Sequence, residues 1–165
     1  MTELNATLAS TLASRFHANL ARVRELGLPL SERQFWAKPY PYGNSFGHLV
    51  LHLTGNLSYY IGAEIAKTGY IRDREREFTE PNPPSKEEAL KRLGDAVAVV
   101  IETVDAQSPA DWAEAYSAMN TNCSNRLDMV LQCMAHMQHH IGQMIYVSKE
   151  WQRQGEATSP DRSVT

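Results

Sequence analysis

Five of the six histidines in this sequence fall into two short clusters, and their spacing suits the binding of a metal ion. His48 and His52 form the first cluster, and His136, His139 and His140 form the second. Side chains at positions i and i+4 of an α-helix lie on one face, about one turn apart. His136 and His140 can therefore bind one ion from successive turns, and imidazole nitrogen is a good ligand for zinc, nickel, copper or iron.

A metal site that keeps an open coordination position usually has three protein ligands, so the first cluster is expected to supply one more. At about 100° per residue, His52 lies about 60° from the apolar Leu49, on the flank of the buried stripe of its helix. His48 lies nearly opposite that stripe. We therefore predict that His52, His136 and His140 are the metal ligands.

The remaining polar residues near the two clusters are expected to play supporting parts at most. His139 is turned away from both of its neighbouring ligands, and His48 is a surface group or a partner of a ligand. Gln143, one turn after His140, is placed to hydrogen-bond a ligand or a bound water. Zinc-finger and metalloprotease signatures do not fit, because the chain has no Cys-x-x-Cys and the segment HLVLH lacks the required glutamate.

Two further side chains, Glu64 and Cys133, have two possible interpretations each. Glu64 falls in the apolar stripe of its helix, and we favour a position near an exposed helix end over a buried, paired and functional carboxylate. Cys133 is one turn before the second histidine cluster, but burial in the core is its expected role. Cys123 and Cys133 are the only cysteines, and they are expected to be reduced thiols in a cytoplasmic protein.

Hydrophobic periodicity predicts four long helices and no strand, which favours an all-α four-helix bundle. The expected helices cover roughly residues 4–26, 45–67, 85–107 and 125–151. Asn44 or Ser45 is a candidate N-cap for the second helix, and Ser85 with Glu88 is a candidate capping box for the third. The bundle is expected to form one metal-binding domain over residues 1–152, followed by a flexible tail over residues 153–165.

Two connections between the helices are expected to be irregular. The charged run RDREREF (residues 72–78) and the Pro-rich EPNPPS after it predict an exposed connector. Residues 111–124 have no clear periodicity, and Trp112 and Tyr116 are their expected anchors.

Composition excludes several classes of partner. The chain has 165 residues, a net charge of -3 and a pI of about 6.1, so neither a nucleic-acid footprint nor a basic membrane-binding surface is indicated. No apolar run approaches the roughly 20 residues that span a bilayer. The first residues carry neither a basic leader nor a hydrophobic core, so a signal peptide is not expected, and the predicted location is the cytoplasm.

The two histidine motifs together resemble the DinB/YfiT-like superfamily of four-helix metal-binding proteins. The resemblance rests on GNSFGHLVLHLTGN (residues 43–56) and HMQHHIGQM (residues 136–144). The run at 72–78 and the WAKP segment at 36–39 resemble a poorly characterised subgroup. Carried over by motif, the family's three ligands fall on His52, His136 and His140, as helical geometry also predicts.

This resemblance implies a divalent metal ion, commonly zinc or nickel, with water or substrate completing its coordination, and frequent homodimers. Characterised relatives include transferases and isomerases that use low-molecular-weight thiols. We therefore expect a thiol-dependent S-transferase acting on a small molecule, with a metal-bound water or thiol as nucleophile and no protein general base assigned. The alternatives are a metal-dependent hydrolase and a non-catalytic, stress-related metal-binding protein whose site is closed by His48 or Glu64. A helical module whose histidines bind nothing is the plainest alternative.

Overall fold

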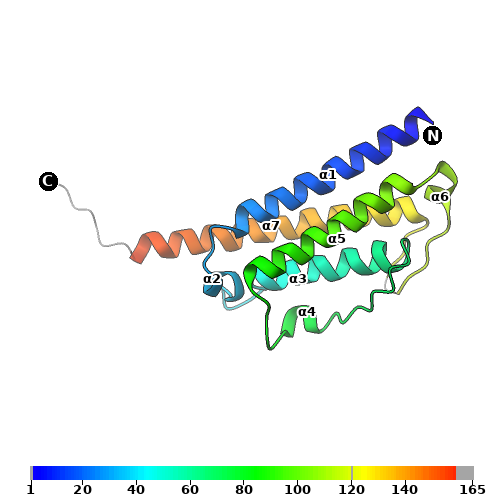
Figure 1. The fold of residues 1–165 in the computed structure, drawn as a ribbon. Coiled ribbons are helices and arrows are strands. Elements are labelled where there is room, and N and C mark those ends of the chain that lie inside the picture. The colour runs from blue at the N-terminus through cyan, green and yellow to red at the C-terminus, as the bar shows by residue number, and fades with distance from the viewer. Residues whose placement is uncertain (1, 120, 159–165) are drawn as a thin grey trace.

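The computed structural model describes residues 2–119 and 121–158, and it confirms the predicted all-α bundle (Figure 1). The long helices are α1 (Glu3–Gly27), α3 (Phe46–Leu57) with its π-helical continuation η1 (Ser58–Ala63), α5 (Lys86–Ala106) and α7 (Arg126–Thr158). Three short helices lie in the connections: α2 (Glu32–Trp36), α4 (Arg76–Thr79) and α6 (Pro109–Ala113). The β-structure among the described residues is one isolated bridge between Ala115 and Asn125.

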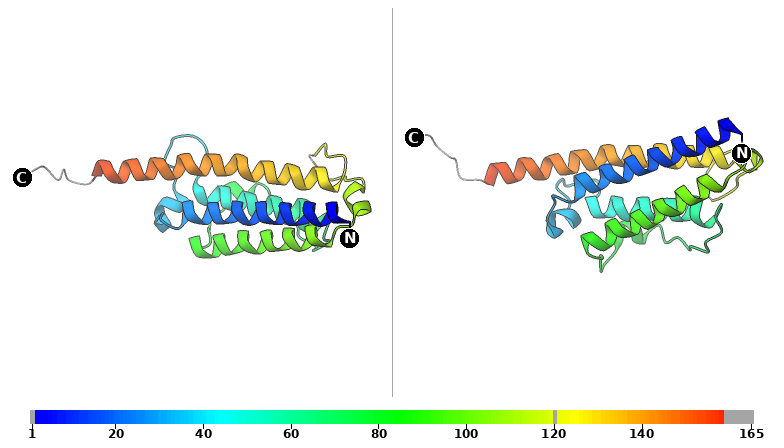
Figure 2. Two further views of the ribbon diagram at one scale, coloured as in Figure 1. Left: turned by 90° about the horizontal axis from the view of Figure 1, so that it is seen from above. Right: turned by 45° about the horizontal axis from the view of Figure 1, so that its top comes forward.

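The long helices alternate around the bundle. Helix α1 packs against α5 and α7, and α3 packs against the same two helices from the other side (Figure 2). Helices α3 and α5 run in the same direction, so the chain must return along the bundle between them (Figure 1). Residues 64–85 make this return, and α4 lies within it. This long crossover is the feature of the fold that brings a loop segment against the side of α3.

Apolar side chains spaced three and four residues apart turn inward from each long helix. On α1 these include Leu12, Phe16, Leu20 and Val23, all of them buried. Such a stripe associates with the other stripes because burial removes apolar surface from water. On α7 the buried side is rich in methionine, with Met129, Met137 and Met144 almost fully enclosed. Both cysteines are free and buried, as expected of residues that fill the core.

Two of the long helices begin at the N-capping serines that the sequence predicts, with one difference in the hydrogen bonds. Ser45 is the N-cap of α3, and its side chain accepts a hydrogen bond from the backbone N–H of His48. Ser85 caps α5 in the same way. The predicted capping box at Ser85 is only half formed, because the carboxylate of Glu88 pairs with Arg92 instead of reaching back to the cap.

Two helix ends also differ from expectation. The helix that begins at Phe46 changes to π geometry at Ser58 and ends at Ala63, short of the expected end near Lys67. Helix α7 continues past Trp151 to Thr158, because Trp151 is buried and Glu150 pairs with Arg153 in the next turn. Residues 153–158 of the predicted flexible tail are therefore helical, and residues 159–165 lie outside the described part of the chain. Over the described residues, no helix is both long and apolar enough to cross a membrane.

Candidate metal centre

The two helices that carry the histidine clusters face each other in the bundle, with His52 on α3 and His136 and His140 on α7. His52 follows the buried Leu49 by one turn and is itself buried. His136 precedes His140 by four residues, so both rings project from the same face of α7. The structure thus brings together the three residues that the sequence singles out, and their ligand atoms all lie within 4.8 Å of one another.

The three rings point their Nε2 atoms at a common centre. The Nε2 of His52 lies 2.8 Å from that of His136, which lies 3.1 Å from that of His140. For Zn–N bonds of about 2.0–2.1 Å in a tetrahedron, neighbouring nitrogens are about 3.3–3.4 Å apart. Small movements of the rings would open the site to that spacing. The donor set of three imidazoles therefore fits a zinc-like divalent ion.

Hydrogen bonds fix the protonation pattern of two of the rings. The Nδ1–H of His52 donates to Oε2 of Glu77 at 2.7 Å. The Nδ1–H of His140 donates to Oε1 of Gln143, also at 2.7 Å. Because these hydrogen bonds place the proton of each ring on Nδ1, the lone pair on Nε2 faces the centre. Partners of this kind orient metal-binding histidines and raise their basicity.

The carboxylate beneath His52 is held in turn by an arginine. Arg72 donates from Nε to Oε1 of Glu77 at 2.7 Å and from Nη2 to Oε2 at 3.0 Å. The side chains of Arg72 and Glu77 are only 9% and 6% exposed. Burial alone would raise the pKa of Glu77, but the hydrogen bonds from His52 and Arg72 outweigh it and lower that pKa. Glu77 therefore stays ionised, and its charge is balanced by Arg72.

A glycine makes room for this carboxylate on α3. A Cβ at Gly55 would lie 2.0 Å from Oε1 and 2.8 Å from Cδ of Glu77. Gly55 is one turn after His52, so the missing side chain lets the carboxylate pass the helix and reach the ring. The ring of Phe78 packs over His52 with the ring centroids 4.8 Å apart, and encloses the same contact.

The expectation of an exposed connector over residues 72–85 is wrong for two of its side chains. Arg72 and Glu77 from that segment are buried against α3, while their neighbours Asp73, Arg74 and Glu75 are exposed. Alternating charges in a short run gave no indication of which carboxylate faces inward. Two signals were present: an aromatic residue directly after Glu77, and a glycine on α3 one turn from the predicted ligand.

The other predicted residues fall outside the cluster, with one exception. Gln143 contacts His140 as described above, and its Nε2 lies 3.4 Å from Nε2 of the exposed His139. His48 is half-buried, and its Nδ1 lies 2.7 Å from Oγ of Ser45, away from the centre. Among the described residues, neither His48 nor Glu64 joins the three histidines as a fourth ligand.

Burial and the neighbouring rings favour the neutral form of His136 and His140 on α7. Burial lowers the pKa of His136 to about 4, and the neighbouring His140 and His52 act in the same direction. Burial also lowers the pKa of His140, against the hydrogen bond to Gln143 that raises it. Neutral imidazole is the form that binds metal ions, so neither His136 nor His140 has to lose a proton to bind one at neutral pH. His136 needs only a change of tautomer that moves its proton from Nε2 to Nδ1.

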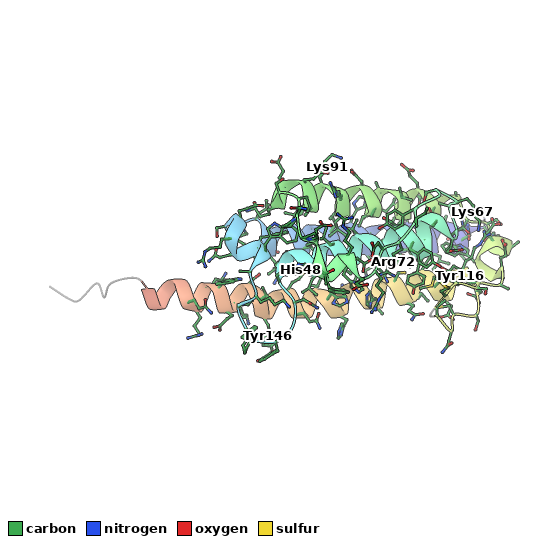
Figure 3. The ribbon with its side chains drawn as sticks, turned by 90° about the horizontal axis from the view of Figure 1, so that it is seen from below. His48, Lys67, Arg72, Lys91, Tyr116 and Tyr146 are labelled. Carbon is green, nitrogen blue, oxygen red and sulfur yellow. The ribbon has the colours of Figure 1, made fainter. Side chains whose placement is uncertain are left out.

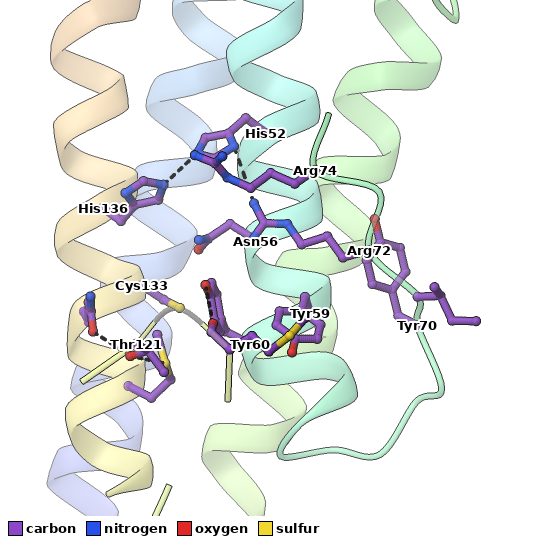
Figure 4. A pocket seen from close by; sticks show the side chains of 14 residues that line it. His52, Asn56, Tyr59, Tyr60, Tyr70, Arg72, Arg74, Thr121, Cys133 and His136 are labelled. Atoms are coloured by element: carbon purple, nitrogen blue, oxygen red, sulfur yellow. Dashed lines mark hydrogen bonds between the residues drawn. The ribbon is translucent and has the colours of Figure 1, made fainter. Parts of the chain in front are cut away.

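A cavity of about 750 Å³ opens beside the three histidines, and His52 and His136 are part of its wall (Figure 4). Cys133 also lines it, but the side chain is almost fully buried, which is the role expected from the sequence. Burial raises the pKa of the Cys133 thiol, which keeps it protonated and a poor nucleophile. An ion held by the histidines would lie at the edge of this cavity.

Comparison with known proteins agrees with this architecture. The family model of the DinB superfamily matches residues 15–144, which include all three histidines. A solved structure described as the conserved protein of locus from Enterococcus faecalis superposes with a TM-score of 0.71 at 15% identity, covering 87% of this chain and 96% of that one. A search of curated proteins returned no match. The likeness to the solved structure concerns the fold, and the family model covers most of the chain: the protein belongs to the DinB superfamily.

Proposed function

We propose that this protein is a divalent-metal-dependent enzyme that transfers the sulfur of a low-molecular-weight thiol to an electrophilic small molecule. The observation that carries the proposal is the convergence of three Nε2 atoms beside a cavity large enough for a small substrate, with His52 and His136 in the cavity wall. Three protein ligands leave a position free for a substrate atom, as in catalytic metal sites generally. Zinc and nickel are the proposed ions, because both accept imidazole ligands at this spacing.

In this mechanism, the protein holds the ion and presents the substrates. His52, His136 and His140 bind the metal, while Glu77 and Gln143 hold two of the rings with Nε2 facing inward. A divalent ion held there would supply Lewis acidity, which would lower the pKa of a thiol bound beside it. The S–H proton passes to water, a new S–C bond forms, and the leaving group departs from carbon with its bonding electrons.

The composition of the cavity wall favours transfer of a thiol over hydrolysis. Among the described residues that line the cavity there is no aspartate or glutamate, whereas two arginines, Arg72 and Arg74, are present. Metal-dependent hydrolases commonly use a carboxylate as general base toward the attacking water. A thiol, with an ordinary pKa of about 8.5, is far more acidic than water and needs no such base once it is coordinated.

The test is a thiol-transfer assay on untagged protein loaded with zinc or nickel. Glutathione, bacillithiol and mycothiol would each be mixed with an activated aryl chloride or a bimane, and the conjugate followed by absorbance or fluorescence. We expect turnover with at least one thiol, and its loss in His136→Ala and in metal-stripped protein. No conjugate with any thiol, together with hydrolysis of ester substrates, would assign the hydrolase alternative instead.

We also propose that the protein forms a homodimer in the cytoplasm. Leu131 and Tyr146 expose large side chains on α7, and Tyr146 stands on the outer side of that helix (Figure 3). Such surface can be buried against a second copy. Light scattering at micromolar concentration would give twice the mass of the chain, and a single-chain mass would contradict the dimer.

A further inference from the structure

A buried amide lies one turn beyond the first predicted ligand. Asn56 follows His52 by four residues on α3, and only 7% of its surface is exposed. Its Oδ1 has no hydrogen-bond partner among the described residues. Buried polar side chains in native proteins are nearly always hydrogen-bonded, so an unpaired one in the wall of a cavity points to a partner outside the chain.

The amide of Asn56 belongs to the same cavity as the histidines. Asn56, His52 and His136 all line it, and Figure 4 shows the Asn56 side chain directed across it toward α7. At about 1.5 Å of rise per residue, Asn56 is about 6 Å along α3 from His52. A ligand that reaches both the histidine centre and Asn56 therefore needs a polar group only a few bonds from its head.

An arginine without a counter-ion lines the cavity as well. Arg74 is exposed and forms no ion pair with any described residue, whereas the charge of Arg72 is balanced by Glu77. Because no carboxylate lines this cavity among the described residues, the free guanidinium makes it attractive to anions. Carboxylate is one of the groups, with phosphate, that a guanidinium binds through paired hydrogen bonds, and it is the one that a cysteine derivative carries.

We propose that the cavity selects a thiol that carries both an amide and a carboxylate, with Asn56 reading the amide and Arg74 the carboxylate. An amide presents an N–H donor beside a C=O acceptor, and so it can pair with both Oδ1 and Nδ2 of Asn56. A cysteine whose amino group is acylated has this arrangement, with its sulfur a few bonds from the amide nitrogen. The assignment of the sulfur end rests on the proposed function, while the two recognition contacts do not depend on turnover.

Four small thiols separate the two contacts in binding experiments on the metal-loaded protein. N-acetylcysteine has the amide and the carboxylate, N-acetylcysteamine has only the amide, mercaptopropionate has only the carboxylate, and ethanethiol has neither. Affinity would be measured by isothermal titration calorimetry. We expect N-acetylcysteine to bind tightest and ethanethiol weakest, with the other two between them.

Matched variants then assign each contact to a residue. Asn56→Leu keeps the branched shape of the side chain and removes the amide, and it should weaken the binding of N-acetylcysteine and N-acetylcysteamine about three- to tenfold without affecting mercaptopropionate. Arg74→Gln should weaken the binding of the two thiols that carry a carboxylate, N-acetylcysteine and mercaptopropionate, about two- to fivefold. The loss should be smaller at high salt, because this side chain is exposed. Arg15→Gln, an exposed arginine on α1 away from the cavity, is the control and should change nothing.

The result that overturns the inference is equal affinity of the wild-type protein for all four thiols. Equal losses for all four thiols in Asn56→Leu, at unchanged metal content and melting temperature, would also overturn it. If Asn56→Leu does not fold, Asn56→Ser and the wild-type thiol series make the same distinction. Selective binding without turnover would refute the proposed function and leave this inference standing, and turnover without selectivity would do the reverse.

Discussion

Replacing Gly55 by alanine should weaken metal binding although it replaces no predicted ligand and changes no charge. The new Cβ would lie 2.0 Å from Oε1 of Glu77, and real Cβ contacts essentially never fall below 3.0 Å. Oε1 must therefore move by about 1 Å or more, and because both oxygens belong to one rigid carboxylate, this movement also displaces Oε2 from its 2.7 Å hydrogen bond with His52. Loss of the partner of a metal-binding histidine typically lowers metal affinity tenfold to a hundredfold, or about 1.4–2.7 kcal/mol.

Gly55→Ala should weaken metal binding even though helix propensity predicts that the same substitution stabilises α3. Alanine in place of glycine inside a helix stabilises it by about 1 kcal/mol, so Gly55→Ala should fold at least as well as the wild type unless the displaced Glu77 costs more. Gly142→Ala on α7 is the matched control. It lies two residues after His140, and a Cβ there would meet nothing within 4 Å.

The assay is competition for zinc between the untagged protein and a fluorescent chelator, with circular dichroism to follow folding. We expect Gly55→Ala to lose at least tenfold in zinc affinity and Gly142→Ala to match the wild type. Wild-type affinity in a folded Gly55→Ala protein would refute the claim that Glu77 supports the metal centre through His52. An equal loss in Gly142→Ala would show that the effect comes from helix geometry and not from the carboxylate.

Three further outcomes follow from the same contacts. Glu77→Gln should lower zinc affinity at least tenfold and also destabilise the fold, because it leaves Arg72 buried without a counter-ion. The double variant with Arg72→Gln should recover stability in urea unfolding but not zinc affinity. Recovery of both would be inconsistent with a role for Glu77 at the metal. The metal-free protein should lose stability as pH falls from about 6.5 towards 4. The pKa of His136 is lowered to about 4 in the fold, so over this interval the unfolded chain binds the proton and the folded chain does not. Calorimetry that finds constant stability over this interval would contradict the prediction. Phe16→Ala should cost about 3–5 kcal/mol in urea unfolding, because its ring is fully enclosed in the bundle core, and a cost below about 1 kcal/mol would be incompatible with that packing.

The sequence was sufficient for the helices and for the three histidines because both are local periodic signals. The expected helices over residues 45–67 and 125–151 both carry apolar residues at helical spacing, and the i, i+4 relation of His136 and His140 is fixed once the second of them is assumed. The choice of His52 over His48 needed only the angle between the ring and the apolar stripe. The structure places those three rings together, and the binding of a metal by them stays a prediction.

The support beneath the site could not be predicted in the same way. Glu77 reaches His52 across 25 residues, through a crossover whose path depends on α3 and α5 running parallel. No periodicity encodes that contact, and a charged run is usually solvated, so the burial of Arg72 and Glu77 depends on tertiary packing. Asn56 was missed for a similar reason: its amide is notable only because the surrounding chain leaves it unpaired.

The most direct test of the central claim is a crystal structure of the untagged, zinc-loaded protein with anomalous data collected at the zinc edge. One anomalous peak per chain should lie about 2.0–2.1 Å from Nε2 of His52, His136 and His140, with its fourth position facing the cavity. A peak bonded to other side chains, a fourth protein ligand closing the site, or no peak between these rings would contradict the account.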